Sequence, residues 1–130
     1  MFLKCALFNL TRPVRINKQN LGDLMKLGIV ISTDDIEAIW NAFRLANFSK
    51  NEGDDVKVFL VGKAVEYEEK GTKHFPAKGE AEKFVSVGGI ILACGTCLKL
   101  RNKPGDNVCP ISSLKDLYAL VKESDKIVCF

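Results

Sequence analysis

Several features that define other protein classes are missing from this chain of 130 residues. Only ten glycines and four prolines are present, which excludes collagen-like and low-complexity chains. No apolar run approaches the ~18 residues that a membrane-spanning helix needs, so no such helix is expected. The apolar stretch after Met1 lacks a small-residue cleavage site, so no signal peptide is expected. What is present, 47% hydrophobic and 27% charged residues, is typical of a soluble globular protein.

The positive charge is concentrated at the start of the chain. The formal net charge is +3, and the first 26 residues hold five basic side chains against one acidic side chain. The rest of the chain is therefore close to neutral, which argues against nucleic acid as a direct ligand. We expect two parts, a basic extension over residues 1–24 and an α/β domain over residues 25–130. The extension is either disordered or part of an over-extended gene start, and the alternative is a docked basic arm.

The apolar pattern predicts strands that alternate with helices. Strands are expected at residues 27–31, 56–61, 90–93, 108–109 and 126–130. Helices are expected at about 36–48, 63–70, 78–87 and 98–101, and a last helix from residue 110 onward. This alternation predicts a parallel sheet with right-handed crossovers, and the wholly apolar third strand is expected at its centre.

The sequence also predicts where the apolar residues of two helices lie and what kind of turn follows the second strand. Trp40 and Phe43 lie at helical spacing on the first helix and are expected in the core or at a subunit interface. The apolar face of the last helix should comprise Leu114, Leu117, Tyr118 and Val121. Gly62-Lys63 follows the second strand but lacks the rest of a phosphate-binding loop, which favours a plain turn.

The five cysteines are Cys5, Cys94, Cys97, Cys109 and Cys129. In a chain without a signal peptide they indicate a reducing cytoplasm, where close cysteines point to thiol chemistry or metal binding. Cys94 is expected at a strand-to-helix junction, where backbone N–H groups and the helix dipole stabilise a thiolate. Lys99 and Arg101 follow closely and add positive potential. Cys97 lies three residues on, at the spacing that lets two sulfurs meet.

A CxxC motif has three interpretations here. The first is half of a tetrahedral zinc site, which Cys109 and His74 could complete, although the second CxxC of a zinc ribbon is absent. The second is a thioredoxin-like disulfide exchanger, which would place the motif after the first strand of its fold rather than the third. The third is a persulfide carrier, in which one thiolate accepts sulfur and passes it on.

A resemblance decides among these interpretations. Residues 28–130 resemble the DsrE/TusD-like sulfur-transfer family, also called DsrE/DsrF-like. The most specific segment is Ala93-Cys94-Gly95-Thr96-Cys97-Leu98-Lys99-Leu100-Arg101, with further matching segments at residues 28–35, 58–66, 109–117 and 124–130. The resemblance implies a three-layer α/β sandwich with a mostly parallel, flavodoxin-like sheet of about five strands. It also implies persulfide relay in the cytoplasm and assembly into homotrimers, hexamers or heterohexamers.

The function expected from the sequence is therefore cytoplasmic sulfur relay. The family's sulfur-carrying cysteine corresponds to Cys94, with Cys97 as a resolving thiol that attacks the persulfide. Members with a single cysteine at this point differ from this chain, which adds Cys97 and Cys109. We expect sulfur donor and acceptor proteins as partners, a homo-oligomer, and no cofactor. The alternatives are a non-catalytic assembly subunit of the same fold, or a thiol–disulfide or zinc-binding protein.

Overall fold

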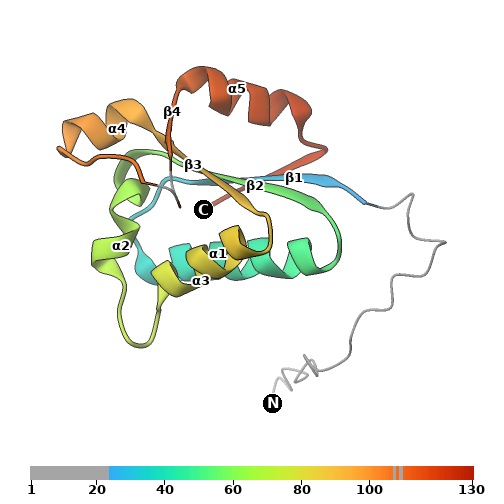
Figure 1. The fold of residues 1–130 in the computed structure, drawn as a ribbon, viewed down its shortest axis with the longest axis horizontal. Coiled ribbons are helices and arrows are strands. Elements are labelled where there is room, and N and C mark those ends of the chain that lie inside the picture. The colour runs from blue at the N-terminus through green and yellow to red at the C-terminus, as the bar shows by residue number, and fades with distance from the viewer. Residues whose placement is uncertain (1–23, 107, 109) are drawn as a thin grey trace, which may run out of the picture.

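The computed structural model describes residues 24–106, 108 and 110–130 (Figure 1). Cys109 and all but the last residue of the expected basic extension lie outside this part of the chain. In chain order the elements are β1 (Lys26–Ile31), α1 (Ile36–Asn51), β2 (Asp55–Leu60), the 3₁₀ helix η2 (Gly62–Glu66), α2 (Tyr67–Lys70), α3 (Ala77–Ser86), β3 (Ile90–Cys94), α4 (Gly95–Leu100), β4 (Ile111–Ser112), α5 (Leu114–Glu123) and β5 (Lys126–Cys129).

The five strands form one parallel sheet in the order β4-β3-β2-β1-β5. The parallel α/β fold expected from the sequence is thus confirmed. The strand at the centre is β2, so the expectation that β3 is central was wrong. The strand β3 lies between β2 and β4, and β4 pairs with it at only two positions, Ala93 with Ile111 and Cys94 with Ser112.

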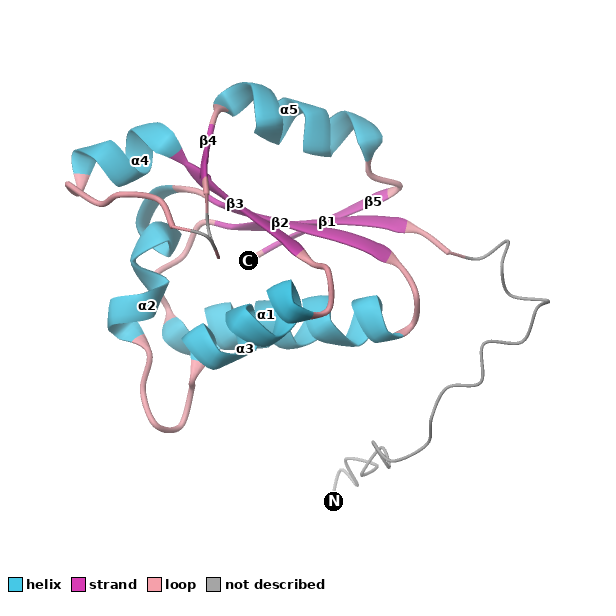
Figure 2. Cartoon of the chain, viewed as in Figure 1, coloured by secondary structure: helices cyan, strands magenta, loops and turns pink. Residues whose placement is uncertain are grey.

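Helices cover both faces of the sheet, with α1 and α3 on one side and α4 and α5 on the other (Figure 2). The connections from β1 to β2 and from β2 to β3 pass over the first face. The connection from β4 to β5 runs back over the second face, as right-handed crossovers require. Within the described residues, no helix combines the length and the hydropathy that a membrane crossing requires.

The two faces of the sheet are buried to different degrees. The face toward α1 and α3 is fully buried and forms the core, with Leu27, Ile29, Ile31, Val56, Val58, Leu60, Ile91 and Ala93. On the opposite face Val30 and Leu92 are only half-buried, and Ile90 is exposed. The helices on that side therefore cover the sheet incompletely.

The start of the last helix differs from the expectation. Val108 lies in a bend rather than a strand, and the fourth strand is β4 at Ile111–Ser112. The helix begins at Leu114 because Ser113 and Asp116 form a capping box, in which each side chain bonds the other residue's backbone N–H. This local cap stops the helix from extending back toward Pro110.

Side chains of α5, of the residue after it and of β5 pack closely over Gly28 on β1. A Cβ at this position would lie 2.5 Å from Ile127 Cδ1, 2.7 Å from Ser124 Oγ and 2.9 Å from Leu120 Cδ2. We predict that Gly28→Ala lowers the free energy of unfolding by about 1–3 kcal/mol, because these side chains must shift to admit the methyl group.

The matched control is Gly79→Ala in α3, where a Cβ would have no heavy atom within 4 Å. This change should raise the free energy of unfolding by about 0.5–1 kcal/mol through helix propensity. Urea unfolding of both variants measures the difference, and equal stability of the two would contradict the packing described for α5.

Candidate functional site at the end of strand β3

The two cysteines of the CxxC motif lie where β3 passes into α4. Cys94 is the last residue of β3 and the cap residue of α4. Both Cys94 and Cys97 are half-buried free thiols. Gly95 lets this turn pass close to β4, because a Cβ there would lie 2.9 Å from Ile111 Cγ2 and 3.0 Å from the Ser112 carbonyl oxygen.

Three donors near the Cys94 sulfur favour its charged form. They are the backbone N–H groups of Thr96 and Cys97 and the thiol of Cys97. Burial alone would raise the pKa of Cys94, but these donors stabilise the thiolate more strongly and hold its pKa below the ordinary value. The expected junction thus supplies the N–H donors that favour a reactive thiolate at this position.

The Cys97 sulfur is held between Cys94 and the loop that follows β2. The backbone N–H of Gly62 donates to Cys97 Sγ at 3.2 Å. Burial raises the pKa of Cys97, as do the hydrogen bond to Cys94 and the charge there, while the Gly62 N–H and Arg101 lower it by less. The two thiols therefore differ in acidity, and Cys97 keeps its proton when Cys94 has lost its own.

Gly62 was not expected at the site, because a lone Gly-Lys pair favoured a plain turn. Its φ of +61° is in the left-handed region, which glycine adopts without a steric penalty. With this backbone conformation the chain leaves β2, begins η2 and directs an N–H toward Cys97. The only sequence signal was a glycine directly after a strand, which does not reveal a contact 35 residues along the chain.

Arg101 lies beside Cys97 rather than Cys94. Its Nη1 donates to the Cys97 carbonyl oxygen at 3.1 Å, and its Nε donates to Glu66 Oε1 at 3.1 Å. Glu66 also faces Lys70, which pairs with Asp34 after β1. This chain of charges ties α4 to α2 and to the loop after β1. The side chain of Lys99 is on the exposed side of α4.

The remaining candidate residues are separate from this pair or fall outside the described chain. His74 is exposed in the loop between α2 and α3, and Cys129 is exposed at the end of β5. Cys109 lies outside the described residues. Among the residues that the structure describes, no cluster of three or more His, Cys, Asp or Glu side chains could hold a metal ion.

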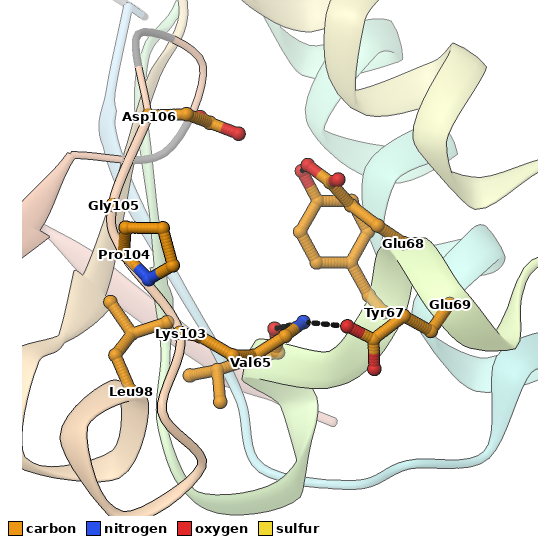
Figure 3. Close-up of a pocket in the computed structure, with 9 residues that line it drawn as sticks. All are labelled: Val65, Tyr67, Glu68, Glu69, Leu98, Lys103, Pro104, Gly105 and Asp106. Carbon is orange, nitrogen blue, oxygen red and sulfur yellow. Dashed lines mark hydrogen bonds and ion pairs between the residues drawn. The ribbon is translucent and has the colours of Figure 1, made fainter.

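A pocket of about 240 Å³ lies on the other side of α4 (Figure 3). Leu98 of α4 and Lys103 line it opposite Tyr67 and Glu68 of α2. Lys103 Nζ donates to the Val65 carbonyl oxygen and pairs with Glu69, as the dashed lines in Figure 3 show. Neither cysteine lines this pocket, so it is distinct from the thiol pair.

The apolar face of α5 points away from the sheet. Leu114, Tyr118 and Val121 are 78%, 63% and 52% exposed, and only Leu120 of this helix is fully buried. By contrast, Phe43 of α1 is fully buried, and Trp40 packs against Phe75. Three large apolar side chains are thus exposed together on α5, whereas α1 exposes Phe48.

Comparison with protein families identifies the chain. The model of the DsrE/DsrF-like family matches residues 25–130, which includes every strand and both cysteines of the site. The chain belongs to the DsrE/DsrF-like family. The resemblance described from the sequence is therefore confirmed.

Two archaeal proteins and two solved structures are similar to this DsrE/DsrF-like chain. It is 31% identical over 100 residues to MJ0989 of Methanocaldococcus jannaschii and to MK0008 of Methanopyrus kandleri, covering 72% of this chain and 88% and 83% of those proteins. The ychN protein of E. coli aligns with a TM-score of 0.72 at 22% identity, over 82% of this chain and all of the other. BT1422 of Bacteroides thetaiotaomicron aligns with a TM-score of 0.66 at 21% identity, over 88% of this chain and all of the other. The two structures establish a shared fold.

Proposed function

We propose that this chain is a sulfur-relay protein that accepts a sulfur atom as a persulfide on Cys94 and passes it to an acceptor. The observation that carries the proposal is the position of Cys94 at the end of β3 and the cap of α4, where nearby donors favour its thiolate. A thiolate is the nucleophile in sulfur exchange, so the cysteine with the lowered pKa is the one suited to accept sulfur. Membership of the DsrE/DsrF-like family supports sulfur relay in general.

The accepting step exchanges one sulfur–sulfur bond for another. The Cys94 thiolate attacks the outer sulfur of a donor persulfide, the donor leaves as a thiolate, and Cys94 keeps the transferred sulfur. Delivery repeats this exchange when a thiolate of the acceptor attacks the outer sulfur on Cys94. No net oxidation takes place, so the step needs no bound cofactor.

The proposal also defines the setting in which the protein works. Its partners are proteins that donate or accept sulfur, and neither nucleic acid nor a membrane takes part. The reaction requires free thiols, which persist in the reducing cytoplasm. The N–H donors at Cys94 act on a half-buried sulfur that a partner's thiol can still approach.

Sulfur loading at Cys94 can be tested by mass. We predict that the Cys97→Ser variant, treated with a cysteine desulfurase that carries a persulfide, gains the mass of one sulfur atom. The serine keeps the shape of the site and removes the one thiol expected to discharge Cys94. The same variant with Cys94→Ser added should gain none, because the accepting thiolate is absent.

Cys129→Ser is the matched control, since it removes an exposed cysteine outside the pair. It should leave loading unchanged when it is added to Cys97→Ser. Equal loading with and without Cys94 would refute the assignment. A chain that assembles normally but never loads would instead be a non-catalytic assembly subunit.

We also propose that the chain forms a homo-oligomer, a trimer or hexamer, through the exposed face of α5. An apolar helix face that its own domain leaves open is a common contact surface between subunits. Leu114, Leu117 and Tyr118, together with Lys115, line an open hollow of about 510 Å³ on this helix. Ile111 of β4 is also exposed, three residues before Leu114.

Assembly through α5 predicts a specific effect of one charged substitution. Tyr118→Glu should dissociate the oligomer, because a charged carboxylate would replace the aromatic ring in the apolar contact and lose its hydration there. Phe48→Glu is the matched control, since Phe48 is 53% exposed on α1 in the opposite layer. Light scattering at micromolar concentration measures both, and a monomeric parent chain or dissociation by Phe48→Glu alone would contradict the assignment.

A further inference from the structure

Resting on the proposed function, we propose a second reaction at the same site. Once Cys94 carries sulfur, Cys97 attacks Cys94 Sγ and releases the carried sulfur as sulfide. The substrate class is a persulfide, and the products are sulfide and a Cys94–Cys97 disulfide. Gly62 and Arg101 are positioning residues that prepare Cys97 for this attack.

The geometry places Cys97 Sγ between two different partners. On one side its thiol donates a hydrogen bond to the Cys94 sulfur. On the other side it accepts a hydrogen bond from the Gly62 N–H at 3.2 Å. The Cys97 sulfur is therefore in contact with a backbone donor as well as with Cys94. This donor favours a negative charge on Cys97, although Cys97 is protonated in the resting pair.

In the resting state the charge on Cys94 keeps Cys97 protonated. Besides burial, the causes that raise the pKa of Cys97 are its hydrogen bond to Cys94 and the negative charge on that sulfur. The opposing influences come from Gly62 and Arg101. The unloaded pair therefore has one thiolate, at Cys94, which is the sulfur that must attack the donor.

Loading of sulfur onto Cys94 removes the negative charge on Cys94 Sγ, which keeps Cys97 protonated in the resting state. When Cys94 forms a persulfide, the negative charge moves to the outer sulfur and Cys94 Sγ becomes a neutral bridging atom. The Gly62 N–H and the Arg101 guanidinium stay beside Cys97, so the balance shifts toward its thiolate. Its proton passes to the outer sulfur, which then becomes a good leaving group.

The releasing step balances without another oxidant. The Cys97 thiolate attacks Cys94 Sγ, a bond between the two cysteine sulfurs forms, and the bond to the outer sulfur breaks. The outer sulfur leaves as HS⁻ with the electron pair of the broken bond. The carried sulfur is thereby reduced by two electrons, and the two cysteines are oxidised by two electrons. An external dithiol reductant is the class of co-reactant that resets the pair for another turnover.

The test is a single turnover in the absence of reductant. The parent chain, Cys97→Ser, Cys94→Ser and Cys129→Ser are each treated with cysteine persulfide without oxygen and then freed of excess donor. Intact mass follows the carried sulfur, and a sulfide-trapping reagent measures what is released. Cys129→Ser should behave like the parent chain, since that cysteine lies outside the pair.

We expect the parent chain to release one sulfide and to end two hydrogens lighter than the reduced chain. Cys97→Ser should load equally and keep its sulfur at least about tenfold longer, because no neighbouring thiolate attacks Sγ. If the parent chain retains sulfur as long as Cys97→Ser does, this inference fails while loading at Cys94 stands. If Cys94→Ser loads and releases as the parent chain does, both the inference and the proposed function fail.

Substitution of Arg101 separates a role in sulfide release from a merely structural role, because the rates of loading and release are measured separately. Arg101→Gln should slow sulfide release about three- to tenfold more than it slows loading, because the charge favouring the Cys97 thiolate is gone. Arg101→Lys keeps a positive charge and should recover part of the release rate. Equal slowing of loading and release in Arg101→Gln would overturn its assignment as a residue that positions Cys97 for release.

Discussion

The proposed sulfur relay depends on the interaction between the Cys97 thiol and the Cys94 sulfur. This interaction makes the two thiols unequal, because one proton serves both sulfurs and lies on Cys97. Two identical side chains three residues apart would otherwise compete for the same charge. In the relay that we propose, this difference lets Cys94 accept sulfur while Cys97 stays protonated.

The parallel sheet brings the required groups to one place. Neighbouring strands in such a sheet end at the same edge, where loops converge on a ligand or reactive group. Here β3 ends in Cys94 and the loop after β2 supplies the Gly62 N–H. The ion pairs of Glu66 with Arg101 and of Lys70 with Asp34 hold α2, α4 and the loop after β1 around this edge. The site is therefore assembled from three strand ends that lie far apart in the sequence.

The sequence predicted the parts of this arrangement that local chemistry determines. Short β-branched apolar runs predicted the buried strands, and the position of Cys94 at a strand end predicted the donors on its sulfur. The two-residue strand β4 gave no such signal, since its pairing depends on tertiary contact rather than on pattern. The contact of Gly62 with Cys97 and the outward face of α5 were missed for the same reason. Amphipathic spacing marks an apolar face on α5 but does not say whether that face meets its own sheet or another molecule.

The most direct measurement is an ultraviolet titration of thiolate formation in a chain whose cysteines outside the pair are replaced by serine. The account predicts two separate steps, the first below the ordinary cysteine pKa from Cys94 and the second above it from Cys97. Adding Cys97→Ala should leave one step, moved upward because the donor beside the Cys94 sulfur is lost. Two overlapping steps at the ordinary value, unaffected by the loss of Cys97, would contradict the account.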